Sequence, residues 1–132
     1  IQKYYFYSRN LKYKWIYFNT DYIFKICVFG NYNTGKTSFL NYLQKFKYVE
    51  YYEPTIGVEY SSKTITLENK ETVKVTFWDC AGQERFHSVT NNFFKNVSAG
   101  LLFFDVTNKK SYESVISWVE KFRKNNDENI LY

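Results

Sequence analysis

The chain has 132 residues, a net charge of +5 and 45% hydrophobic residues. This length suits a single domain, because one core normally takes about 100–150 residues, and no uncharged stretch approaches the roughly 20 apolar residues that a membrane-spanning helix needs. The two cysteines, Cys27 and Cys80, stand far apart in the sequence, which excludes a disulfide framework and a metal-ligand pattern and favours a reducing compartment.

Residues 1–23 are predicted to form an N-terminal arm outside the core. They hold nine aromatic residues, and four basic residues against one acidic residue, without the period of a strand or a helix. Aromatic and basic side chains together could serve single-stranded nucleic acid or a membrane surface. Because no amphipathic period accompanies them, an arm that packs on the domain or extends from it is preferred, and no nucleic acid partner is expected.

Residues 24–29 are predicted to form a buried parallel strand. The run is short and β-rich, carries one charge near its start and ends at Gly30. A glycine-bearing loop follows it. Apolar residues then recur at helical spacing, which predicts a helix with one apolar face: Phe39, Leu40, Leu43 and Phe46.

The next two runs alternate apolar and polar residues and predict an antiparallel hairpin. They span 58–67 and 72–78, and the link between them is short and polar. The segment 79–92 lacks such a period and is predicted to be mostly loop.

Residues 99–106 predict another fully buried strand, and an amphipathic helix begins near Ser111. Strands that alternate with helices indicate an α/β fold whose sheet is covered on both faces. A further strand is expected to begin near Ile130 beside the 99–106 strand, so the fold is expected to be incomplete at its C-terminal side. The apolar stripe of the helix is predicted to contain Tyr112, Val115, Ile116, Val119 and Phe122.

A phosphate loop is predicted at residues 30–37. They have the pattern G-x-x-x-x-G-K-T and stand between a predicted strand and a predicted helix. The glycines let backbone N–H groups point at phosphate oxygens, and the helix N-terminus adds partial positive charge. Lys36 supplies a full charge to the β- and γ-phosphates, and the Thr37 hydroxyl is placed to bind Mg²⁺. A turn that only caps a helix is disfavoured by both flanking elements. The predicted phosphate-binding residues here are Gly30, Asn33, Thr34, Gly35, Lys36, Thr37 and Ser38.

A D-x-x-G-Q motif at 79–83 ends the second strand of the hairpin, 43 residues after Lys36. Because α/β sheets bind ligands at the carboxyl ends of their strands, Asp79 is placed to hold Mg²⁺ through water. Gly82 allows a close backbone approach to a γ-phosphate, and Gln83 is predicted to be catalytic by orienting the attacking water. An ordinary turn is the usual explanation of an isolated D-x-x-G, but the spacing and the Gln-Glu-Arg-Phe that follows disfavour it.

Thr55 stands in the segment 54–57, whose simplest interpretation is a turn at the start of a strand. With the other two motifs present, Thr55 becomes a second threonine ligand of Mg²⁺ in the phosphate site. A ligand in such a loop is released when the γ-phosphate is lost.

Together these segments resemble the Rab GTPases. The resemblance lies in the phosphate loop, in Thr-Ile-Gly-Val-Glu-Tyr at 55–60, in Trp-Asp-Cys-Ala-Gly-Gln-Glu-Arg-Phe at 78–86 and in 104–115. It covers residues 24–132 and implies a partial small GTPase domain. The implied fold is the three-layer sandwich of phosphate-loop NTPases, with a mostly parallel sheet and one antiparallel edge hairpin.

The resemblance also implies GTP or GDP and Mg²⁺ as ligands. By the spacing of the family, Tyr48 falls against the guanine ring and Tyr52 falls over the phosphates. The chain holds no Asn-Lys-x-Asp segment, so the expected guanine specificity rests on the resemblance.

A Rab-like protein would be a GTP-hydrolysing switch that regulates intracellular vesicle and membrane traffic from the cytosolic face of endomembranes. Its GTP form would recruit effectors through 48–60 and 79–95, and exchange factors and GTPase-activating proteins would set its state. The chain has no C-terminal cysteine to prenylate, so membrane attachment would need a further tail.

Two departures from the family pattern matter for the site. Tyr32 stands where Ras-like proteins usually carry a small residue, and a phenol there would crowd Gln83 and an incoming arginine finger. Slow, poorly stimulated hydrolysis is therefore expected. Cys80 replaces the threonine usual after the aspartate, which is interpreted as a packing change.

Two other functions stay open. A phosphate-loop NTPase that uses ATP is disfavoured by Thr55 and the motif at 79–83. A pseudo-GTPase scaffold that acts through its surface is favoured by Tyr32 and opposed by the intact Lys36, Thr37 and Gln83.

Overall fold

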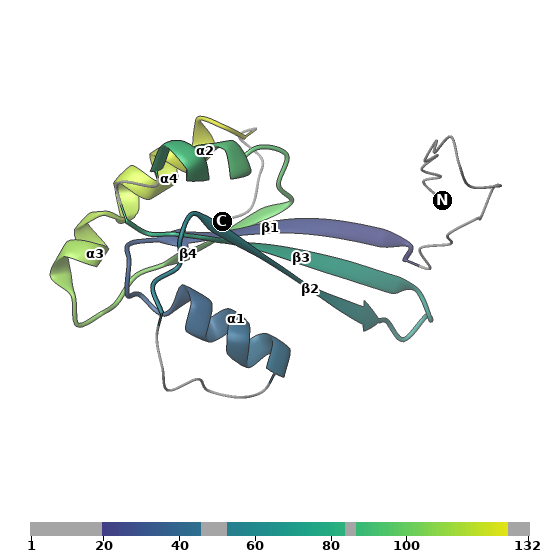
Figure 1. The fold of residues 1–132 in the computed structure, drawn as a ribbon. Coiled ribbons are helices and arrows are strands. Elements are labelled where there is room, and N and C mark those ends of the chain that lie inside the picture. Colours follow the sequence, from purple (N-terminus) through teal and green to yellow (C-terminus); the bar gives the residue numbers. More distant parts are fainter. Residues whose placement is uncertain (1–19, 46–52, 84–86, 127–132) are drawn as a thin grey trace, which may run out of the picture.

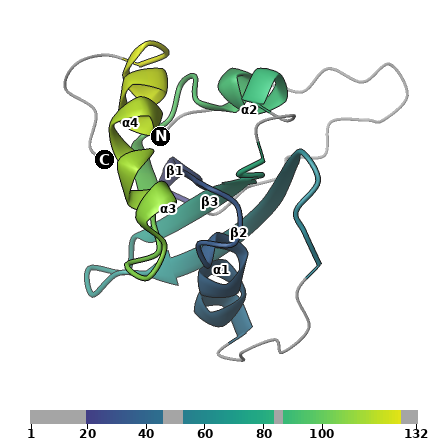
Figure 2. The same ribbon diagram turned by 90° about the vertical axis from the view of Figure 1, so that its left-hand side faces the viewer.

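A computed structural model describes residues 20–45, 53–83 and 87–126. Its centre is a four-stranded sheet of order β2-β3-β1-β4, with helices on both faces (Figure 1). Helix α1 covers one face, and α2 and α4 cover the other, as the view turned by 90° also shows (Figure 2). The predicted three-layer α/β sandwich is confirmed. The elements are β1 (Tyr22–Gly30), α1 (Lys36–Lys45), β2 (Val58–Thr66), β3 (Thr72–Cys80), α2 (His87–Phe93), β4 (Ala99–Phe103), α3 (Lys109–Glu113) and α4 (Val115–Arg123).

The sheet is parallel except for its β2–β3 edge. Strand β1 pairs in parallel with β3 and β4, while β2 pairs antiparallel with β3, which confirms the predicted hairpin. Cys27 of β1 lies opposite Trp78 of β3 and Gly100 of β4. The carboxyl ends of the three parallel strands therefore meet at one edge of the sheet, where α/β proteins bind ligands.

Strand β1 begins two residues before the predicted strand. Tyr22 and Ile23 pair with β3, and the Asp21 carboxylate accepts a hydrogen bond of 2.7 Å from the Thr72 backbone N–H. Both side chains are half exposed, so their order comes from backbone pairing rather than from burial. The rest of the predicted arm, residues 1–19, lies outside the described residues and stays a prediction.

Two local predictions are wrong. Helix α2 lies where a loop was predicted, since its sequence, HSVTNNF, has too few apolar residues for a helical period. The helix is held by its packing, because Thr90 and the adjoining Phe94 are fully buried. Strand β4 ends at Phe103 and is mostly half-buried, because it is the last strand of the described sheet.

The buried face of the last helix differs from the predicted stripe. Tyr112 and Ile116 are 63% and 72% exposed, whereas Trp118 and Phe122 are buried. Ser111, Trp118 and Phe122 share one helical face across the α3–α4 junction, so the buried face is rotated from the predicted stripe. The apolar period placed Phe122 correctly and missed Trp118.

The larger core cluster lies between the sheet and the α2–α4 layer. Phe29 of β1 stacks on Phe122 with ring centroids 4.9 Å apart and contacts Phe94 at 5.2 Å. A Cβ at Gly100 would come within 2.8 Å of both the Phe29 and Phe122 rings. Glycine at this position therefore lets α4 approach the sheet. Among the described residues, no helix is long and apolar enough to cross a membrane.

We expect Phe122→Ala to lower the free energy of unfolding by about 3–5 kcal/mol, because it leaves a cavity among Phe29, Phe94 and Gly100. Ile116→Ala on the same helix is the matched control and should change it by less than about 0.5 kcal/mol. Urea unfolding measures both values. Equal losses for the two variants would contradict the observed orientation of α4.

Candidate functional site

The loop between β1 and α1 has the backbone of a phosphate cradle. Gly30, Asn33 and Gly35 have φ angles of 132°, 58° and 88°, which lie in the region that favours glycine. A Cβ at Gly30 would collide with the Phe103 carbonyl at the end of β4, so this position admits only glycine. Helix α1 begins at Lys36 and therefore directs its N-terminal N–H groups toward the loop.

Lys36 is a buried cation. Its side chain is 5% exposed, and Nζ donates a hydrogen bond of 2.6 Å to the Asn31 carbonyl oxygen. Burial lowers the pKa of Lys36 to about 8, although the nearby Asp79 carboxylate favours the charged form. An ammonium group with so little water around it gains strongly from an anionic ligand.

Three oxygen-bearing side chains from separate segments meet beside Lys36. The Thr37 hydroxyl donates a hydrogen bond of 2.6 Å to Asp79 Oδ2, and it lies 2.9 Å from the Thr55 hydroxyl. Because the Thr37 hydroxyl uses its one hydrogen in the bond to Asp79, the Thr55 hydroxyl is the donor in the bond between the two threonines. Burial raises the pKa of Asp79, while the Thr37 hydrogen bond and the Lys36 charge oppose that rise.

This oxygen cluster fits a hard divalent cation. Asp79 Oδ1 is buried and has no hydrogen-bond partner among the described residues, so one carboxylate lone pair is available to a ligand. Mg²⁺ is usually bound by one or two protein oxygens together with waters and substrate phosphates. In the described part of the chain, no group of three or more His, Cys, Asp or Glu residues could hold a metal ion, so the threonine hydroxyls are essential to this fit.

A cavity of about 310 Å³ opens above these groups. The segment after β3 forms one wall, because a Cβ at Gly82 would collide with the backbone of Asn31 and Tyr32. Glycine thus lets the third motif lie directly on the phosphate loop. The cavity is lined by Tyr32, Asn33, Thr34, Gly35, Lys36, Thr37, Ser38, Pro54, Thr55, Gly82 and Gln83.

The predicted site residues take different positions around this cavity. Gln83 and most of the predicted phosphate-binding residues line the cavity. Gly30 lies behind it against β4, and Asp79 lies beneath it, hydrogen-bonded to the lining residue Thr37. Tyr48 and Tyr52 fall outside the described residues. The sequence did not point to Asn31, because the loop pattern accepts any residue at that position.

Cys80 belongs to the core rather than to the cavity. It is fully buried, and its Sγ lies 3.4 Å from Sγ of Cys27 on the neighbouring strand. The hydrogen bond between the thiols and their burial raise the pKa of Cys27. Buried neutral thiols are inert, which favours a packing role for Cys80.

The sequence model of the Ras family matches residues 25–132 of the chain. The chain belongs to the Ras family. It is 35% identical over 111 residues to the Ras-related protein RABA2d of Arabidopsis thaliana, covering 84% of this chain and 51% of that protein. It is 33% identical over 113 residues to the Ras-related protein Rab-19 of Homo sapiens, covering 86% of this chain and 52% of that protein. The predicted resemblance to the Rab GTPases is confirmed, and the chain spans about half the length of these curated relatives.

We expect Thr37→Val, which removes the hydroxyl without changing the volume much, to lower the free energy of unfolding by about 1–3 kcal/mol. The reason is that Asp79 Oδ2 would stay buried without its donor. Thr64→Val on the exposed part of β2 is the matched control and should be near neutral. Denaturant unfolding without nucleotide measures both, and a neutral Thr37→Val would contradict the described hydrogen bond.

Proposed function

We propose that the protein is a GTP-binding and GTP-hydrolysing switch of the Rab type. The observation that supports this most strongly is the meeting of Lys36, Thr37 and Asp79 from two separated motifs around one cavity. Membership of the Ras family adds guanine nucleotide and Mg²⁺ as the expected ligands. Gln83, which lines the same cavity, favours a hydrolysing switch over a scaffold that binds nucleotide without hydrolysis.

Each group in the cavity has a separate task in this proposal. Backbone N–H groups of the phosphate loop and the Lys36 ammonium hold the β- and γ-phosphates. Thr37, Thr55 and Asp79 would hold Mg²⁺, which supplies charge neutralisation at the phosphates when bound. The Gly82 backbone approaches the γ-phosphate, and Gln83 orients the attacking water.

The Thr55 segment is the part of the site that would change position between the GTP and GDP forms. The Thr55 hydroxyl contacts Thr37, while the neighbouring residues Pro54 and Ile56 are exposed. When the γ-phosphate is lost, Thr55 would release the Mg²⁺ ion that it would share with Thr37. The segment is then free to leave, and the surface that it forms changes.

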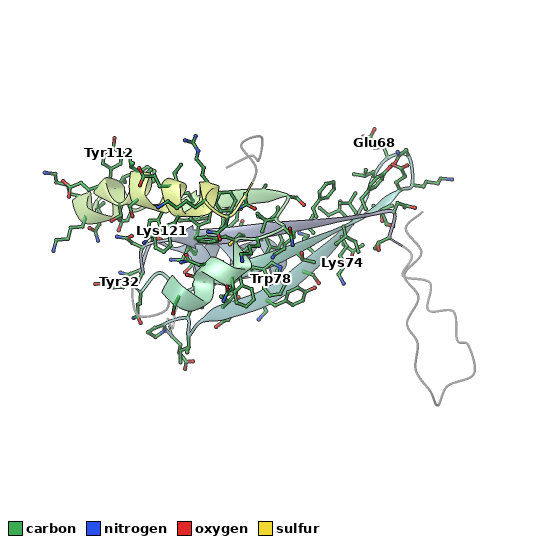
Figure 3. The ribbon with its side chains drawn as sticks, turned by 90° about the horizontal axis from the view of Figure 1, so that it is seen from above. Tyr32, Glu68, Lys74, Trp78, Tyr112 and Lys121 are labelled. Atoms are coloured by element: carbon green, nitrogen blue, oxygen red, sulfur yellow. The ribbon has the colours of Figure 1, made fainter. Side chains whose placement is uncertain are left out.

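A contiguous aromatic surface is available to partners of this switch. Tyr60, Trp78 and Phe93 form a row with ring centroids 5.2 and 5.1 Å apart, and Tyr60 is 53% exposed (Figure 3 labels Trp78). Exposed aromatic side chains are typical of binding hot spots. The row falls within the segments 48–60 and 79–95 and the strand between them, through which effectors would bind.

The remaining parts of the proposal follow from the Rab relatives. Exchange factors and GTPase-activating proteins would set the nucleotide state, and the GTP form would regulate vesicle traffic at the cytosolic face of endomembranes.

The direct test is competition of unlabelled nucleotides against a fluorescent GDP analogue in the presence of Mg²⁺. We expect GDP and GTP to compete, ADP and ATP to compete far more weakly, and chelation of Mg²⁺ to weaken binding. Single-turnover hydrolysis of bound GTP then tests the enzymatic step. Equal competition by ADP, or bound GTP that is never hydrolysed, would contradict the proposal.

A second prediction concerns Tyr32. Its side chain is 60% exposed at the cavity rim, at the phosphate-loop end of the molecule (Figure 3), and the cavity wall also includes Gln83. An arginine finger is worth about 10³–10⁵ in kcat in Ras-type enzymes, so a side chain that obstructs it has a large effect. We expect Tyr32→Ser to speed hydrolysis, above all with an activating protein. Unchanged intrinsic and stimulated rates would disprove an obstructing role.

A further inference from the structure

The side chain of Asn31 ties the phosphate loop to helix α4. Its Oδ1 accepts a hydrogen bond of 2.6 Å from the Trp118 indole N–H, and its Nδ2 donates one of 3.1 Å to the Ser114 hydroxyl. These residues are 87 and 83 positions away in the sequence. No part of the loop pattern or of the proposed catalytic set accounts for this connection.

The donors and acceptors of this cluster form one ordered chain. An indole N–H can only donate, so it fixes the orientation of the Asn31 amide with Oδ1 toward Trp118. The amide N–H then donates to Ser114, whose own hydroxyl donates to the Lys110 carbonyl at 2.7 Å. Asparagine suits this position because it provides an acceptor and a donor on the same side chain.

Ser114 lies between α3 and α4 with helical φ and ψ angles of −78° and −11°. Its hydroxyl donates to the Lys110 carbonyl four residues earlier, a bond that serine commonly makes in a helix, and it makes no side-chain capping bond. The same hydroxyl oxygen accepts the Asn31 amide N–H, so the helical layer offers the phosphate loop an oriented acceptor.

The backbone of Asn31 is the part that reaches the nucleotide site. Its carbonyl oxygen accepts hydrogen bonds from the Lys36 ammonium at 2.6 Å and from the Thr34 hydroxyl at 2.8 Å. The same peptide unit lies against Gly82, where no Cβ would fit. A shift of Asn31 would therefore move the ammonium and the third motif together.

We propose that Trp118 and Ser114 are positioning residues for nucleotide binding, acting through Asn31 to fix the carbonyl group that aims the Lys36 ammonium at the β- and γ-phosphates. This inference rests on the proposed function. Trp118 also packs in the core, 6.2 Å from the Phe29 ring, but a phenylalanine would preserve most of that packing. The indole N–H is the feature that packing alone does not require.

The test measures GDP dissociation from the protein loaded with a fluorescent GDP analogue and chased with excess GDP. The variants are Trp118→Phe, Ser114→Ala, Asn31→Ala and the double variant Asn31→Ala with Trp118→Phe. We expect Trp118→Phe and Asn31→Ala to raise the dissociation rate about fivefold or more, which matches the loss of one hydrogen bond. The double variant should not exceed Asn31→Ala by much, because both changes break the same chain.

Two controls separate positioning from general destabilisation. Phe122→Leu removes core packing from the same helix and should lower the melting temperature without changing GDP dissociation. GMP lacks the β-phosphate that Lys36 reaches, so its affinity in competition should be the same for wild type and Trp118→Phe. A loss of GMP affinity equal to the loss of GDP affinity would mean a structural role only and would overturn the inference.

The remaining outcomes are also decisive. Wild-type GDP binding together with unchanged dissociation in Trp118→Phe and Asn31→Ala overturns this inference and leaves the proposed function standing. A folded wild-type protein that binds no guanine nucleotide overturns both. If Trp118→Phe does not fold, Ser114→Ala, which leaves the core intact, takes its place, and a wild-type rate in that variant overturns the inference.

Discussion

The hydrogen bond of 2.6 Å from the Thr37 hydroxyl to Asp79 Oδ2 is the interaction on which the rest of the site depends. It joins the first turn of α1 to the end of β3 across the carboxyl edge of the sheet. Burial of Asp79 would be costly without a donor. With it, the carboxylate keeps one oxygen available beside a desolvated ammonium, and the Thr55 segment is drawn in through the same hydroxyl.

Topology explains why these groups meet. The parallel pairing of β1 with β3 and β4 aligns three carboxyl ends. The phosphate loop and the 79–83 motif leave the sheet at that edge, and the Thr55 segment enters β2 there. Glycine then sets the distances: Gly30 lies against β4, and Gly82 lies against the phosphate loop. The Asn31 amide completes the arrangement from the helical layer, so the loop is held by the sheet on one side and by α4 on the other.

Elements with a regular apolar period and motifs with a fixed spacing could be predicted from the sequence. Features that depend on tertiary contacts could not. Strand β1, the hairpin and the loop motif follow from apolar periods and from the fixed order of glycine, lysine and threonine. Helix α2 could not be predicted, since packing of Thr90 and Phe94 holds it rather than its own period. Ile116 was placed in the buried stripe and Trp118 was left out of it, because the apolar residues of this helix fit a helical period on more than one face and only packing against the sheet selects one. Asn31 carries no signal at all, because its importance lies in partners more than 80 positions away.

The most direct measurement is a crystal structure of the protein with Mg²⁺ and a non-hydrolysable GTP analogue. We expect the ion at about 2.0–2.1 Å from the Thr37 hydroxyl oxygen, with Asp79 beside it through water. We also expect Lys36 Nζ within hydrogen-bond distance of the β- and γ-phosphate oxygens. An ion bound away from Thr37 and Asp79, or a triphosphate that does not contact Lys36, would contradict the proposed site.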